Sequence, residues 1–177
     1  KYVNGNSYGE SSRIANHPLG NNRVYYNDET GQKSFGITHD YRLGMNYAFG
    51  KNHRLDVAYT GHWDKRCSNS RTTGSSISGM HHDSHEYLHN VDVNYSLPFG
   101  LTLNGSYTYY RTPQQQALDG TMHTDESMSE TERNLTSGSE QTINKWMFTA
   151  DQTHSLAHGW GLSYGVKGQF TSNKSYQ

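Results

Sequence analysis

The residues with the clearest chemical potential form one short cluster near the middle of the chain. It consists of His81, His82, Asp83, His85 and Glu86. Imidazole and carboxylate groups at such short spacing suit zinc, copper or nickel, because these ions accept nitrogen and oxygen ligands. We therefore treat the five residues as a candidate metal site, or as a source of axial ligands for haem. The alternative is a solvated polar loop that is rich in histidine and binds nothing.

Other chemical signatures are missing from the sequence. It has no Gly-x-Ser-x-Gly elbow, no His-Glu-x-x-His pair and no phosphate-binding glycine loop. A single cysteine, Cys67, excludes an internal disulfide framework and a multi-cysteine zinc site. The net charge of -1 offers no basic surface for nucleic acid. We therefore expect no enzyme, no nucleic-acid partner and no resident cofactor; a metal or haem would be a ligand held by the histidine-rich loop.

The composition indicates β-structure. Only 31% of the residues are hydrophobic and the mean hydropathy is -0.98, which first suggests disorder. However, the chain is nearly neutral and contains 14 Tyr, 5 Phe and 3 Trp against 3 Pro. Tyrosine and threonine favour strands, whereas glycine and asparagine disfavour helices.

Apolar and polar side chains alternate along several stretches. From Ile37 to Phe49 most odd-numbered positions are apolar or aromatic, and the even-numbered positions between them are polar or small. Because successive side chains of a strand point to opposite faces, this pattern predicts a strand with one apolar face. Three hairpins follow from the same reading, at approximately 37–64, 87–111 and 145–171, with short turns near 50–53, 98–100 and 156–159.

Strand and loop lengths favour a membrane barrel over a soluble sandwich. The predicted strands have about 10–12 residues, close to the roughly 9–11 that a tilted transmembrane strand needs. Polar stretches at 65–86 and 112–144 separate the hairpins and are predicted to be long extracellular loops, opposite the short turns. The expected fold is therefore all-β, with antiparallel up-and-down hairpins of a transmembrane β-barrel. It has about six strands, too few to close the barrel.

This reading divides the chain into two regions. Residues 1–36 are expected to form a polar extracellular loop region, and residues 37–177 a segment of the barrel. The polar faces of the strands would line the lumen and contribute Asp40, Arg42, Asp56, Asp92, Tyr110 and Lys167. These charges would tune passage, contact a plug, or only form a hydrated wall.

Two segments resemble a known family. Residues 146–156 and 159–170 resemble the late barrel region of TonB-dependent receptor-like proteins from Bacteroidetes, and residues 41–55 resemble an earlier hairpin of the same group. The resemblance implies an outer-membrane location, energy-coupled uptake of an unknown nutrient, and partners that include lipid, a plug domain and the TonB system. It also implies that the chain is a piece of the wall of a longer barrel.

Two other functions remain open at this point. One is a non-transport outer-membrane surface protein that acts in adhesion or assembly. The other is a soluble β-domain that binds carbohydrate, with tryptophan and tyrosine as stacking platforms.

Overall fold

The chain forms one open antiparallel sheet in a computed structural model that describes residues 2–19, 22–75, 77–123 and 130–177. The strands are β1 (Tyr2–Leu19), β2 (Asn22–Phe49), β3 (His53–Gly74), β4 (Ile77–Ser96), β5 (Leu101–His123), β6 (Glu130–Ser155) and β7 (Gly161–Tyr176), and a short 3-10 turn, η1 (Ala157–Gly159), precedes β7. Each strand pairs with its neighbour in sequence, in the order β1 to β7. The predicted all-β, up-and-down, unclosed architecture is confirmed, with seven strands in the described residues instead of about six.

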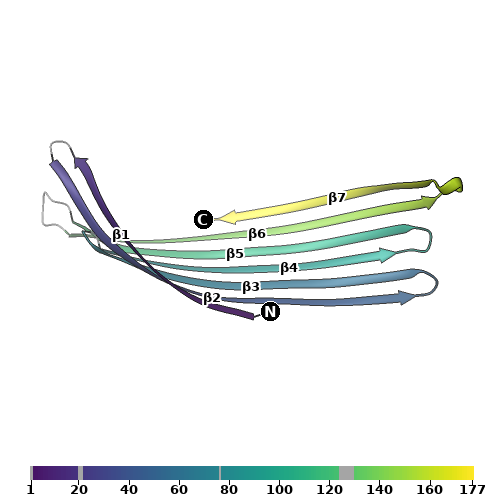
Figure 1. Cartoon of the computed structure of the whole chain (residues 1–177), viewed down its shortest axis with the longest axis horizontal. Coiled ribbons are helices and arrows are strands. Elements are labelled where there is room, and N and C mark those ends of the chain that lie inside the picture. The colour runs from purple at the N-terminus through teal and green to yellow at the C-terminus, as the bar shows by residue number, and fades with distance from the viewer. Residues whose placement is uncertain (1, 20–21, 76, 124–129) are drawn as a thin grey trace.

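The three short turns lie where the sequence predicted them. They connect β2 to β3, β4 to β5 and β6 to β7, and Figure 1 shows all three at one end of the sheet. Gly100 in the second turn has a φ of 83°, and a Cβ there would lie 2.3 Å from the carbonyl oxygen of Thr153. Only glycine fits this position, because an L side chain is disfavoured at this φ and would collide with the backbone of β6.

The long loops predicted at the other end are instead mostly strand. Residues 65–74 continue β3, 77–86 begin β4, and β5 and β6 extend through 112–123 and 130–144. Likewise, residues 2–19 and 22–36 form β1 and the first half of β2, where a loop region was expected. These segments show no apolar alternation because both of their faces are polar, yet their backbones pair residue by residue with the neighbouring strands.

The register of the strands places all the predicted apolar faces on one side of the sheet. Leu43, Tyr59, Val91, Tyr107, Trp146 and Phe170 form one continuous row of paired residues across six strands. The rows of Val57 and Leu55, nearer the short turns, repeat this arrangement. In the row of Trp63 the side chains are aromatic on β2 to β4, whereas β5 to β7 contribute Arg111, Thr142 and Lys174. We call this surface the apolar face, and the opposite surface the polar face.

All seven strands belong to one sheet, and no second layer of described residues covers it. No hydrophobic residue in the described part of the chain is buried, and side chains such as Leu43 (69% exposed) and Val166 (71% exposed) are open. The accessible surface is 13351 Å², whereas a compact monomer of 20.1 kDa would expose about 8,700 Å². Figure 1 shows a single curved sheet in which β1 and the first part of β2 bend away from the other strands. No helix among the described residues is long and apolar enough to cross a membrane.

Candidate functional site

The histidine-rich cluster lies on strand β4, so its side chains alternate between two faces. His81, Asp83 and His85 are paired with Asn69, Cys67 and Lys65 of β3 and share the side of the apolar face. His82 and Glu86 are paired with Ser68 and Asp64 and lie on the polar side. The structure therefore does not gather the five predicted ligands into one site. A strand separates neighbouring residues where a loop would have allowed them to converge.

A different set of metal-binding groups does come together. The Sγ of Cys67, a ring nitrogen of His81 and a carboxylate oxygen of Asp83 all lie within 4.8 Å of one another. Cys67 and Asp83 are direct cross-strand partners, and His81 is two residues from Asp83 on the same face. We call these three residues the thiol–imidazole–carboxylate cluster. It lies beyond Trp63, outside the apolar rows.

Asn69 supports two members of this cluster. Its Oδ1 is hydrogen-bonded to Nδ1 of His81, and its Nδ2 donates to Sγ of Cys67 over 4.0 Å. The other ring nitrogen of His81, Nε2, lies 2.8 Å from Oδ2 of Asp83. The hydrogen bond to Asn69 therefore fixes the orientation of the imidazole and directs Nε2 toward the carboxylate.

The electrostatics of the cluster follow from these contacts. Desolvation raises the pKa of the Cys67 thiol, and the hydrogen bond and charge of Asp83 raise it further, while Lys65 lowers it. The pKa of Asp83 is lowered by its hydrogen bonds with His81 and Cys67. Without a cation, Asp83 is thus an ionised carboxylate beside a protonated thiol.

The remaining predicted ligands have other surroundings. His85 stacks on Tyr87 with ring centroids 6.2 Å apart, and its buried Nδ1 has no hydrogen-bond partner in the described structure. His82 lines a hollow of about 640 Å³ on the polar face, together with Asp64 and Arg66. Glu86 lies beside Asp64 across the β3–β4 pair.

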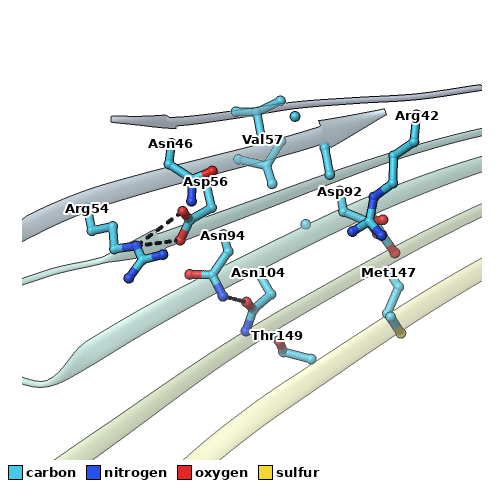
Figure 2. A pocket seen from close by; sticks show the side chains of 15 residues that line it. Arg42, Asn46, Arg54, Asp56, Val57, Asp92, Asn94, Asn104, Met147 and Thr149 are labelled. Carbon is cyan, nitrogen blue, oxygen red and sulfur yellow. Dashed lines mark hydrogen bonds and ion pairs between the residues drawn. The ribbon is translucent and has the colours of Figure 1, made fainter. Parts of the chain in front are cut away.

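The polar face carries a second hollow of about 480 Å³ nearer the short turns. Figure 2 shows its lining as a ladder of polar groups that crosses the sheet. Asn94 Nδ2 donates to Asn104 Oδ1 over 2.7 Å, and Asn104 Nδ2 donates to Thr149 Oγ1 over 2.9 Å. At one side Arg54 Nε lies 3.0 Å from Asp56 Oδ2. We call this hollow the polar groove.

The residues predicted to face the lumen all lie on the polar face. The register assigns this side to Asp40, Arg42, Asp56, Asp92, Tyr110 and Lys167. Arg42, Asp56 and Asp92 line the polar groove. Asp64 on the same face is only 4% exposed; its Oδ1 accepts a hydrogen bond from Thr38 and its Oδ2 pairs with Arg66 at 2.8 Å. The structure confirms that these residues share one face.

Sequence reasoning missed Cys67 and Asn69 because they are remote from the histidines along the chain. The signal that would have found them is the Gly-Ser-Ser sequence at 74–76, a composition typical of turns. Pairing the flanking residues symmetrically about Ser75 places Cys67 opposite Asp83.

Comparisons with known proteins show a weak likeness at the level of the fold. No protein-family model and no curated protein matches the chain. Among solved structures, the ferric yersiniabactin uptake receptor FyuA from Yersinia pestis is similar at 8% identity and a TM-score of 0.39, with 98% of this chain and 30% of that chain covered. BauA, the ferric preacinetobactin receptor from Acinetobacter baumannii, is similar at 10% identity and a TM-score of 0.36, with 97% of this chain and 35% of that chain covered. The chain thus spans about a third of the length of these receptors.

Proposed function

We propose that this chain is part of the wall of an outer-membrane β-barrel that takes up a nutrient by TonB-dependent transport. The observation that carries the membrane location is the apolar face, which is continuous across six strands and lies on a sheet without a buried core. A soluble protein rarely leaves so large an apolar surface open to water. Lipid would cover the apolar face of such a single curved sheet.

The height of the apolar rows supports this location. On β3 itself this face is aromatic or apolar, apart from Gly61, from the turn at His53 to Trp63, which is about 11 residues, or about 36 Å of strand. At the tilt of about 45° of a transmembrane strand this length gives about 26 Å, close to the apolar band of about 25 Å in outer-membrane barrels. The strands continue beyond this band as a polar sheet, which would stand outside the membrane.

The polar face supports the transport part of the proposal. Inward-facing residues of a large barrel line a water-filled or plugged lumen. The polar groove, with Arg42, Asp56, Asp92 and the ladder of amides, would face that lumen and contact a plug or a passing nutrient. The seven described strands leave two open edges, at β1 and β7, which further strands of a complete barrel would cover.

Labelling of cysteines tests the membrane location. In a background with Cys67→Ser, single cysteines are placed at Val57 and at Ala58, neighbours on opposite faces in the middle of the band. We expect a membrane-impermeant maleimide to label Ala58→Cys and to spare Val57→Cys in intact membranes, with both labelled after denaturation. Equal labelling of the two positions before denaturation would contradict the proposal.

Loss of energy coupling tests the transport function separately. Cells that lack this protein and cells that lack TonB should show the same reduced accumulation of one nutrient among haem, ferric chelates, zinc and oligosaccharides. An effect of the protein that persists unchanged without TonB would favour the alternative, a surface barrel that acts in adhesion or assembly.

A further inference from the structure

We infer that Cys67, His81 and Asp83 form a binding site for a thiophilic divalent cation of the zinc class. The three side chains supply one sulfur, one nitrogen and one oxygen donor, which is a set that zinc accepts. They come from two adjacent strands, β3 and β4, so a bound ion would join the two strands beyond the apolar band. This inference does not depend on transport.

The spacing of the donors is compatible with one shared ion. Zinc bonds of about 2.0–2.3 Å in a tetrahedron hold ligand atoms about 3.3–3.6 Å apart. The donors of the cluster already lie within 4.8 Å of one another, and His81 Nε2 and Asp83 Oδ2 are 2.8 Å apart. Small rotations bring the thiol closer and separate the imidazole from the carboxylate. Such rotations are available because Cys67 and Asp83 are half-buried and His81 is exposed.

Asn69 gives the site the supporting contacts that metal centres require. A histidine ligand usually donates its second ring N–H to an oxygen acceptor, which fixes its orientation. Oδ1 of Asn69 accepts that bond from Nδ1 of His81, so Nε2 is the nitrogen that would bind the ion in place of its contact with Asp83. The amide nitrogen of the same residue donates to the sulfur of Cys67.

Pairing of β3 with β4 holds the three donor residues and Asn69 in fixed relative positions. Cys67 and Asn69 on β3 pair directly with Asp83 and His81 on β4, and β2 and β5 pair with the outer edges of these two strands. The backbone is therefore preorganised before the ion binds. Three protein donors leave one position of a tetrahedron for water or an exchangeable ligand, which allows the ion to be released.

Cobalt spectroscopy on the full-length protein in detergent micelles tests the inference. Co²⁺ is the probe, because a thiolate ligand gives a charge-transfer band in the near ultraviolet and tetrahedral geometry gives intense visible bands. We expect one equivalent of Co²⁺ to produce both and Zn²⁺ to displace it. Cys67→Ser should abolish the charge-transfer band, and His81→Ala and Asp83→Asn should each weaken Co²⁺ binding at least about tenfold.

Two further variants distinguish the metal ligands from a supporting residue and from a nearby residue that does not bind the ion. Asn69→Ala should weaken binding about 10-fold to 100-fold while the charge-transfer band stays, as expected for a supporting residue. His82→Ala, a neighbour of both His81 and Asp83 on the opposite face, should change the affinity less than twofold. Circular dichroism and heat-dependent migration in SDS gels verify that each variant is folded. A folded wild-type protein without the band, or a His82→Ala variant as weak as His81→Ala, overturns the inference.

Discussion

The ring of Tyr41 on β2 lies directly over Gly61, its cross-strand partner on β3. A Cβ at residue 61 would lie 2.1 Å from Cε2 of Tyr41 and 2.7 Å from Cδ2. The missing side chain thus makes room for an aromatic ring on the apolar face. On this face the ring of Tyr41 also packs against Tyr59, with the ring centroids 6.2 Å apart. Cross-strand aromatic contacts of this kind are a main source of stability in a sheet that has no core.

This contact predicts that Gly61→Ala destabilises the protein. The added methyl group must displace the Tyr41 ring, and overpacking of this kind costs about 1–3 kcal/mol. Gly44→Ala is the matched control, because the nearest atom to its Cβ is the carbonyl oxygen of Val57 at an ordinary 3.7 Å. Urea unfolding from lipid vesicles measures both free energies. If Tyr41→Ala does not relieve the loss in the Gly61→Ala background, the clash is not its cause.

A charge in the middle of the apolar face should be far more costly than one on the polar face. Val57→Arg places a guanidinium among the predicted lipid contacts and should reduce the free energy of unfolding by about 2–4 kcal/mol. Ala58→Arg places the same group on the polar face beside Asp92, and we expect less than about 1 kcal/mol. The urea midpoints in vesicles report the difference. Equal losses would mean that both faces meet the same solvent.

The sequence predicted the part of the sheet between the short turns and Trp63 well, because there the two faces of each strand differ in polarity. Alternation from Ile37 to Phe49 and from Leu55 to Trp63 reveals which side chains share a face, and the register confirms that they do. Glycine and asparagine mark the turn between them, where Gly50 and Asn52 have positive φ angles.

Beyond Trp63 the same reasoning fails because the two faces of each strand no longer differ in polarity. Residues such as Ser68 and Asn69 have polar surroundings on both faces, so no alternation distinguishes a paired strand from a loop. Backbone pairing with β2 and β4 nevertheless continues there. The thiol–imidazole–carboxylate cluster depends on this pairing, and for that reason the sequence predicted His81 and Asp83 but not Cys67.

The ion pair between Arg111 and Glu140 predicts a defined pH dependence. Nε and Nη2 of Arg111 donate to the two carboxylate oxygens over 2.9 and 2.8 Å. These hydrogen bonds, and then the charge of Arg111, hold the pKa of Glu140 below its ordinary value. A carboxyl with a lowered native pKa contributes stability that is fully present above its unfolded pKa of about 4.3 and is lost as the pH falls through the native value.

We therefore expect Glu140→Gln to lower the urea midpoint at pH 7 and to have little effect well below pH 4. The glutamine cannot titrate, so the difference between wild type and variant isolates this group. Urea titrations of both proteins at several pH values measure it. A difference that grows as the pH falls would contradict the assignment.

The chemistry of Cys67 gives the last prediction, which needs no metal. Because desolvation and the nearby Asp83 carboxylate raise the pKa of the thiol, less thiolate is present near pH 8 than in a free cysteine. Since the thiolate is the nucleophile, alkylation by iodoacetamide should be slower in the folded protein than in urea. Asp83→Asn removes the negative charge and should speed the reaction, whereas Lys65→Gln removes a cation that lowers the pKa and should slow it.

Rates of alkylation measured by mass spectrometry between pH 7 and pH 10 separate the pKa of the thiol from its steric access. Steric access changes the plateau of the rate at high pH, whereas the charge variants shift the midpoint of the pH profile. If both variants move the midpoint in the same direction, the electrostatic account of the cluster is wrong.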